Sequence, residues 1–186
     1  SVPYIKMTLQ LLGELGVDYS WKKNVISIQP KPIVENKTIV VESDWSSASY
    51  YYGLCALSPN SVITLSSYKK TSLQGDAILA EIYENLGVET RFEGNMILLS
   101  NKPKSVDFKL LSLDLINAPD IAQTIVVTCF GLGLECFLTG LHTLKIKETD
   151  RLEALRIELT KLGDKISVTN ESLTLVNSID INSNVK

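Results

Sequence analysis

Three stretches of the chain follow one pattern, and this internal repeat restricts the fold more than any other feature. Each stretch reads as an amphipathic helix, a glycine, a short alternating strand, a polar turn and a second strand. The three stretches are residues 7–29, 77–100 and 151–176. Their shared glycines, Gly16, Gly87 and Gly163, are typical of helices that end in a left-handed turn. The chain is therefore expected to repeat one supersecondary unit.

The apolar residues of the repeats recur with the periods of helices and strands. Helical spacing is seen for Leu152, Leu155, Leu159 and Leu162, and for Ile78, Ile82 and Leu86. Strand alternation is seen for Ile26 and Ile28, Ile97 and Leu99, and Leu173 and Leu175. These periods agree with a helix followed by two strands in each repeat.

A second shared pattern extends two of the repeats into longer units. Residues 44–65 and 118–141 each read as a polar start, an apolar helix, a turn and a strand. Each full unit is therefore predicted to run strand, helix, strand, helix, strand, strand. The two full units are residues 38–102 and 108–176. This alternation predicts an α/β (α+β) class of repeated βαβαββ units.

Two of the predicted helices are apolar almost throughout. They cover residues 50–57 and 121–132. An α-helix without a polar face is usually buried on all sides. We therefore expect both helices inside a lobe, with the sheets outside.

Composition excludes several kinds of protein. The chain is 45% hydrophobic and 21% charged, which is enough to bury a core. A net charge of −3 does not indicate binding to nucleic acid or to a membrane surface. Cys55, Cys129 and Cys136 lie in apolar stretches, which favours buried thiols in a reducing compartment over disulfides or a zinc site. The single histidine, His142, is expected in a loop and cannot form a multi-histidine metal centre.

The charged run KETDR at residues 147–151 is the strongest candidate for chemistry. It opens the helix of the third repeat, where Lys147, Glu148 and Arg151 would share one face if all lie on the helix. One interpretation is a solvated helix start with local ion pairs. The other is an anion site, because two cations oppose the helix dipole unless an anion is bound there. The residues alone leave both open.

Three further positions carry polar groups at predicted helix starts. Asp120 follows a proline and is either a helix-start acid or a carboxylate available for proton transfer. Asp44 is expected to be a helix N-cap. The Gln-Gly-Asp at residues 74–76 is expected to be a structural turn. Neither a glycine-rich phosphate loop nor a catalytic-triad motif is present.

Five segments resemble, in order, signatures of the EPSP synthase (3-phosphoshikimate 1-carboxyvinyltransferase) family. They are SVPY at 1–4, ESDWSSASY at 42–50, LQGD at 73–76, DLINAPDIAQT at 114–124 and KETDRL at 147–152. The resemblance implies two lobes, each of three βαβαββ units. This chain would be a central-to-C-terminal fragment that covers less than half of a member. Residues 1–40 would end one lobe, and residues 41–186 would hold two units of the second.

The resemblance also implies a reaction and roles in it. Members move the carboxyvinyl group of phosphoenolpyruvate to the 5-hydroxyl of shikimate 3-phosphate and release phosphate, without an organic cofactor or a metal. Asp120 would contact the shikimate hydroxyls and accept a proton. Glu148 would exchange protons with the phosphoenolpyruvate methylene, and Lys147 would lie at the reacting hydroxyl. Arg151 would hold the phosphoenolpyruvate carboxylate.

Four other positions match or depart from the family pattern. Ser1 and Tyr4 match residues that line the shikimate 3-phosphate site. Thr143 stands where the family has asparagine, so a hydroxyl would make that substrate contact. Ser43 stands where the family has glycine. Because the family's other substrate contacts are missing, we expect the chain alone to be inactive.

Two alternatives stay open. The sister enzyme, UDP-N-acetylglucosamine 1-carboxyvinyltransferase, shares the fold and the transferred group, although KETDRL and SSASY favour the shikimate enzyme. A module of the same fold without catalysis is the other, although the presence of Asp120, Lys147, Glu148 and Arg151 argues against it. We expect the full-length protein to be a cytoplasmic monomer with no nucleic-acid or membrane partner.

Overall fold

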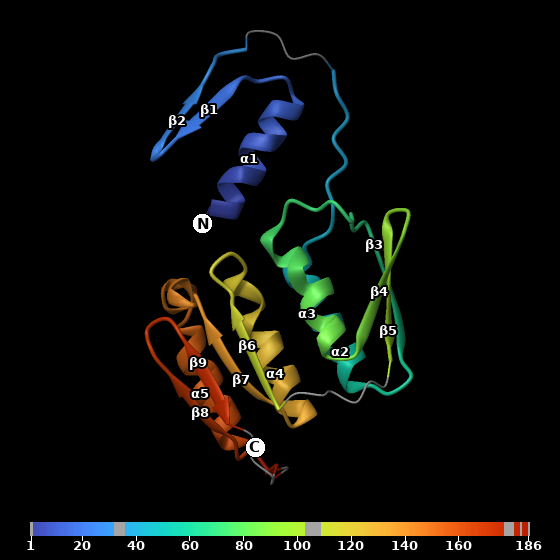
Figure 1. Cartoon of the computed structure of the whole chain (residues 1–186), viewed down its shortest axis with the longest axis vertical. Coiled ribbons are helices and arrows are strands. Elements are labelled where there is room, and N and C mark those ends of the chain that lie inside the picture. The colour runs from blue at the N-terminus through green and yellow to red at the C-terminus, as the bar shows by residue number, and fades with distance from the viewer. Residues whose placement is uncertain (1, 32–35, 103–108, 177–180, 183, 186) are drawn as a thin grey trace.

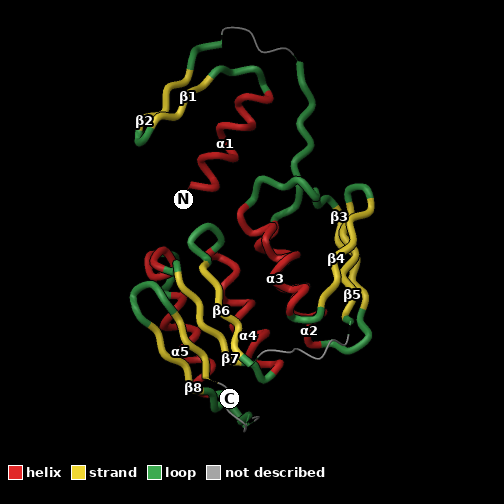
Figure 2. Tube along the Cα trace, in the orientation of Figure 1, coloured by secondary structure: helices red, strands yellow, loops and turns green. Residues whose placement is uncertain are grey.

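The computed structural model describes residues 2–31, 36–102, 109–176, 181–182 and 184–185. The three repeats form three groups of elements that follow one another along the chain (Figure 1). The first group lies at one end of the molecule. The other two groups lie side by side, with α2, α3 and α4 between their sheets (Figure 2).

The first group is a helix followed by a hairpin. It comprises α1 (Val2–Glu14), β1 (Tyr19–Lys22) and β2 (Val25–Ile28). The two strands pair antiparallel, as the repeat pattern predicts. Ile26 and Ile28 of β2 are both exposed. Among the described residues of this group, only Leu9 of α1 is buried.

The second group contains a mostly antiparallel unit without the expected opening strand. Its elements are α2 (Trp45–Leu57), β3 (Val62–Ser66), the 3₁₀ helix η1 (Gly75–Ile78), α3 (Leu79–Asn85), β4 (Val88–Glu93) and β5 (Met96–Asn101). The sheet order is β3-β5-β4. Residues 38–41 are extended but pair with no strand. Asp44 caps α2 as predicted, because its carboxylate accepts from the backbone N–H groups of Ser46 and Ser47 at 3.0 and 3.2 Å.

The third group is a complete βαβαββ unit, as predicted. Its elements are β6 (Leu110–Asp114), η2 (Pro119–Ile121), α4 (Ala122–Leu132), β7 (Glu135–Thr139), η3 (His142–Ile146), α5 (Arg151–Lys161), β8 (Lys165–Val168) and β9 (Leu173–Val176). The sheet order is β6-β7-β9-β8, with β6 and β7 parallel. The order β7-β9-β8 matches β3-β5-β4 of the preceding unit, so the two units share one topology.

The glycines that end the repeat helices are left-handed, as predicted. The φ angles of Gly16, Gly87 and Gly163 are 75°, 87° and 96°. Each lies just beyond the end of its helix, α1, α3 or α5. Glycine adopts this conformation without the steric cost that a Cβ would add. The prediction that a left-handed glycine follows each repeat helix is therefore confirmed in all three repeats.

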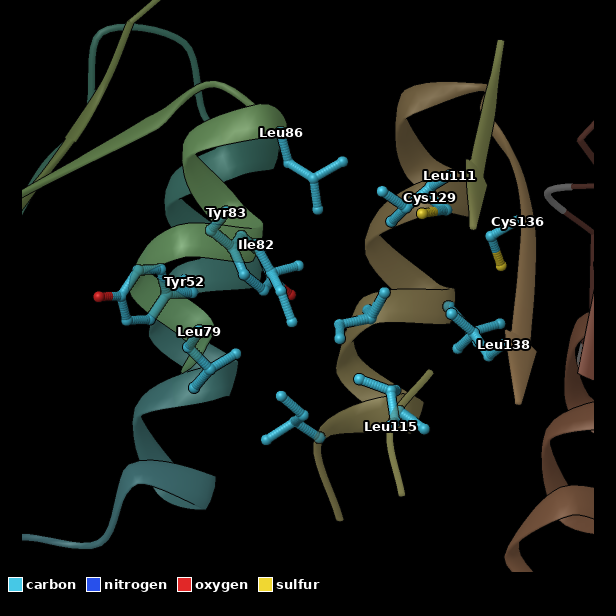
Figure 3. Close-up of a cluster of buried hydrophobic side chains, with 14 of the residues drawn as sticks. Tyr52, Leu79, Ile82, Tyr83, Leu86, Leu111, Leu115, Cys129, Cys136 and Leu138 are labelled. Atoms are coloured by element: carbon cyan, nitrogen blue, oxygen red, sulfur yellow. The ribbon is translucent and has the colours of Figure 1, made fainter. Parts of the chain in front are cut away.

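The core joins the two larger units through their helices. Figure 3 shows Ile82 and Leu86 of α3 pointing toward α4, with Cys136 and Leu138 of β7 on the opposite side of α4. A buried hydrogen bond of 2.9 Å between the hydroxyls of Tyr83 and Thr128 crosses the same junction. The three cysteines are free and buried, as their apolar surroundings predict. None of the helices in the described part of the chain is long and apolar enough to span a bilayer.

The expected burial of the two apolar helices on all sides is wrong. On α2, Tyr50 and Leu54 are 67% and 58% exposed, and Val127 on α4 is also exposed. The opposite face of each helix is buried, for example at Tyr52 and Ile125. Burial depends on which elements pack around a helix, and the described residues cover only one face of each.

Candidate active site

Asp120, at the start of η2, lies between the cationic side chains of Lys147 and Arg151. Lys147 Nζ is 3.0 Å from Oδ1 and 3.2 Å from Oδ2 of Asp120, and Arg151 Nη1 donates to Oδ1 at 3.1 Å. The Asp120 side chain is 17% exposed, so solvent screens these contacts only partly. The fold thus brings together residues from the start of one helical segment and from the loop that precedes α5.

Contrary to expectation, residues 147–150 of the charged run lie before helix α5 and not on it. Helix α5 begins at Arg151, and Asp150 is its N-cap, which accepts from the backbone N–H of Glu153 at 3.0 Å. Lys147 is extended, with φ −80° and ψ −161°. An N-cap residue marks the start of a helix, so Lys147 and Glu148, which precede Asp150, lie in a loop. The charged groups still lie together, because the Arg151 guanidinium contacts both Asp120 and Glu148.

Glu148 joins the cluster through Arg151. Its Oε2 accepts from Arg151 Nη2 at 2.8 Å, while its side chain remains 79% exposed. A bond from its own backbone N–H, followed by Arg151, holds the pKa of the Glu148 carboxyl below its usual value. The carboxylate is therefore ionised and open to solvent, where a ligand can reach it.

Thr143 carries an unsatisfied hydroxyl. Its Oγ1 is buried and has no hydrogen-bond partner within the part of the chain that the structure describes. It lies in η3, one turn before Lys147. A buried hydroxyl without a partner costs free energy, which a ligand can recover by hydrogen bonding.

Tyr4 approaches the same region from α1. The pKa of its phenol is raised by partial burial and then by the carboxylates of Asp76, Asp120 and Asp44. The N-terminal end of α1 faces the loop that follows β6 (Figure 1). Residues of both, together with Ser72 and Leu73, line a cavity of about 330 Å³. Ser1, the other residue expected here, lies outside the described residues.

The structure adds an acid that the sequence interpretation treated as part of a structural turn. Asp76 is only 5% exposed, and its Oδ2 accepts from the Ser46 hydroxyl. The pKa of Asp76 is raised, first by burial and then by Asp120 and Asp44, whereas Ser46 and Lys147 lower it. The LQGD segment was the available signal, because its resemblance to a family signature covers this acid.

The turns around the cluster are bound to one another. The Gln74 side chain accepts from the Trp45 backbone N–H at 2.8 Å and donates to the Ser43 carbonyl at 2.9 Å. Ser43, at the family's glycine position, donates its hydroxyl to the carbonyl of Ser66 at 3.0 Å. These bonds tie the start of α2 to the turn that precedes η1.

Among the described residues, the charged cluster lies outside the two larger cavities. Neither the 330 Å³ cavity nor the larger one, about 380 Å³ between α3 and β6, is lined by the four charged residues. We place the candidate site at the cluster rather than in the larger cavity, because the cluster combines cations with ionisable acids and the larger cavity has no cation among its lining residues. Within the described residues, no group of three or more metal-ligating side chains is present.

The arrangement can bind an anion and move protons. Arg151 and Lys147 supply charge-assisted donors for a carboxylate or a phosphate. Asp120 and Glu148 supply two carboxylates within reach of the same cations, which is what a reaction with two proton transfers requires.

Comparison with known proteins agrees with this geometry. The family model described as EPSP synthase (3-phosphoshikimate 1-carboxyvinyltransferase) matches residues 1–185. A 3-phosphoshikimate 1-carboxyvinyltransferase of Bacteroides fragilis is 43% identical over 174 residues, which are 93% of this chain and 42% of the relative. One of Methanospirillum hungatei is 32% identical over 179 residues, 94% of this chain and 41% of the relative.

The fold also matches solved structures. An EPSP synthase from Acinetobacter baumannii superposes with a TM-score of 0.67 at 19% identity, over 92% of this chain and 40% of that one. The chain thus spans about two fifths of the length of these proteins. Because the family model matches nearly every residue, the chain belongs to the EPSP synthase (3-phosphoshikimate 1-carboxyvinyltransferase) family.

Proposed function

We propose that the full-length protein transfers the carboxyvinyl group of phosphoenolpyruvate to the 5-hydroxyl of shikimate 3-phosphate and releases phosphate. This chain supplies one side of the site. The observation that carries the proposal is the Asp120 carboxylate held between Lys147 and Arg151, with Glu148 on the outer side of Arg151. The names of the relatives favour the shikimate acceptor over a UDP-sugar.

The first step is an addition that needs a base at oxygen and an acid at carbon. Asp120 takes the proton of the shikimate 5-hydroxyl, while the Lys147 ammonium beside it stabilises the charge on the reacting oxygen. Glu148 is ionised in the unliganded protein, so it takes up a proton when the substrates bind. The oxygen then bonds to C2 of phosphoenolpyruvate as Glu148 delivers that proton to C3. The product is a tetrahedral intermediate that still carries the phosphate.

The second step is an elimination that reverses the roles. Glu148 removes a proton from the new methyl group, the C2=C3 double bond re-forms, and the C2–O bond to phosphate breaks. Arg151 binds the carboxylate of phosphoenolpyruvate through both steps, because a guanidinium fork suits a planar carboxylate. In the unliganded arrangement Arg151 contacts both acids, so substrate binding replaces part of these contacts.

Two residues extend the substrate contacts. Tyr4 lies close enough to the acids to line the shikimate 3-phosphate side. The Thr143 hydroxyl, which is buried and has no hydrogen-bond partner among the described residues, would make the substrate contact that the family's asparagine makes. Residues 1–40 would belong to one lobe and residues 41–186 to the other, so that the substrates lie between the lobes. A monomeric, cytoplasmic enzyme that needs neither metal nor organic cofactor completes the proposal.

Turnover with purified full-length protein tests this function. We expect release of phosphate that depends on both phosphoenolpyruvate and shikimate 3-phosphate, with the carboxyvinyl product detected by mass spectrometry. UDP-N-acetylglucosamine serves as the competing acceptor, and the 186-residue chain alone is expected to be inactive. Product formation with the UDP-sugar only, or with neither acceptor, would reject the proposal.

A further inference from the structure

The buried acid at the junction of the two larger units is not used by the proposed reaction. Asp76 is one of the few buried charged residues among those described, and Ser46 is its hydrogen-bond donor. A buried carboxylate with so few donors is expensive to keep ionised. Its position in the site therefore calls for a role other than stability.

The turn that carries Asp76 links the two units directly. Gly75 packs so closely on the next unit that an added Cβ would lie 2.3 Å from the Asn117 carbonyl oxygen. Asn117 leads into η2, which presents Asp120. On the other side of the turn, Gln74 and Asp76 bind the first residues of α2, through Trp45 and Ser46. A displacement of this turn would therefore be felt at Asp120.

The charged groups that face Asp76 come from every surrounding segment. They are Asp44 before α2, Asp120 in η2, Lys147 after η3, and the Tyr4 phenol of α1. The carboxylate at position 76 thus adds negative charge behind the Asp120–Lys147 pair. Like charge favours protonation of an acid, and opposite charge favours protonation of an amine.

We propose that Asp76 is a positioning residue for the Asp120–Lys147 pair: its buried carboxylate, bound by Ser46, holds the 72–78 turn to the start of α2, so that Gly75 packs against the 117–120 turn, and it fixes a negative charge behind the pair. The inference rests on the proposed function, since the pair acts in that reaction. Asp76 itself touches no reacting atom in this role and acts through the two residues in front of it.

Three variants of the full-length protein separate charge, hydrogen bond and burial. Asp76→Asn keeps an acceptor for Ser46 but removes the charge. Ser46→Ala removes the hydrogen bond but keeps the charge. Asp164→Asn is the matched control, because Asp164 is also 5% exposed but lies beyond the end of α5, away from the cluster. The readouts are kcat and KM for both substrates across the pH range.

We expect Asp76→Asn to move both limbs of the kcat profile toward lower pH, by about half a pH unit or more. The reason is that the acid and the amine in front of it each lose a negative neighbour. KM for both substrates should stay within about threefold, because ground-state contacts are unchanged. Ser46→Ala should lower kcat without moving the limbs, and Asp164→Asn should do neither.

A readout that does not need turnover separates this inference from the proposed function. In the 186-residue chain, the phenol of Tyr4 senses Asp76, so Asp76→Asn should lower the pH at which Tyr4 ionises, followed by NMR of its ring. Asp164→Asn should leave that titration unchanged. If the wild type turns over but neither the rate profile nor the Tyr4 titration moves in Asp76→Asn, the inference is wrong. If the Tyr4 titration moves but the wild type never turns over, the proposed function is wrong.

Discussion

Replacing Gly75 by alanine tests whether the two larger units are in rigid backbone contact. The new Cβ would lie 2.3 Å from the Asn117 carbonyl oxygen, which is far inside van der Waals contact, and 3.5 Å from Pro3 Cβ. The neighbouring atom is backbone on a turn that is itself anchored, so it cannot rotate away. The substitution must therefore separate the 72–78 turn from the 117–120 turn.

The size of the effect follows from this geometry. Inserting one methyl group into a closely packed site typically costs about 1–3 kcal/mol. For a chain of this length, 1 kcal/mol corresponds to roughly 2–4 °C in Tm. We therefore expect Gly75→Ala to lower Tm by roughly 2–12 °C, measured by circular dichroism and checked by urea unfolding.

The matched control is another glycine with a close but flexible neighbour. At Gly131 an added Cβ would meet Leu57 Cδ2 at 2.6 Å, the end of an exposed side chain that can rotate. Alanine also favours the helix by up to about 1 kcal/mol. We expect Gly131→Ala to leave Tm unchanged or raise it slightly. Equal Tm values for the two variants would refute the idea of a rigid contact at Gly75.

Further predictions concern the charged residues of the full-length protein. Arg151→Ala should weaken the binding of phosphoenolpyruvate by about 1.5–3 kcal/mol, because a charge-assisted contact is lost. The loss should be seen mainly as a higher KM for phosphoenolpyruvate in steady-state kinetics, and an unchanged KM would contradict this role. Glu148→Gln and Asp120→Asn should each lower kcat by roughly 10²–10⁴-fold with smaller changes in binding, because the proton transfer is lost; near-normal kcat in either variant would remove that residue from the chemistry. Asp76→Asn should raise the free energy of unfolding of the 186-residue chain at neutral pH. The pKa of Asp76 is raised in the folded state, so the wild type loses stability as the pH rises above the ordinary pKa of 3.8. The variant has no carboxyl group at this position and lacks that loss. Thermal unfolding from pH 3 to pH 7 measures this difference, and parallel curves for the two proteins would contradict it.

The repeats could be predicted from the sequence because their signals are local. A helix with one apolar face, a glycine beyond its end and two alternating strands are each encoded within a few residues. All three glycines, Gly16, Gly87 and Gly163, are left-handed as expected. The βαβαββ order also holds completely in the unit from β6 to β9.

The proximity of the candidate site residues could be predicted from the sequence, but their local geometry could not. Asp120 lies beside Lys147 and Arg151 as expected. The placement of Lys147, Glu148 and Arg151 on one helix face was wrong, because α5 begins only at Arg151. The N-cap at Asp150 decides where α5 begins, and helical periodicity does not reveal which of several polar residues will cap. The position of Lys147 in a loop follows from that choice.

The errors that remain come from contacts between distant segments. Apolar composition predicted full burial of α2, yet Tyr50 and Leu54 are exposed, since burial is set by what packs on a helix. Asp76 was assigned to a turn, which is correct locally. Its burial beside Asp120 depends on how two units pack, and no pattern along the chain encodes that packing directly.

The missing strand before α2 has a consequence for how molecules of this chain meet. In the complete unit β6 covers the outer side of β7, whereas the equivalent side of β3 has no strand beside it among the described residues. Such a row of free backbone donors and acceptors is an edge that accepts any extended segment. Residues 38–41 of the same molecule, with the sequence TIVV, form no strand and leave this edge unpaired. The edge of β3 is therefore open to an extended segment of a second molecule.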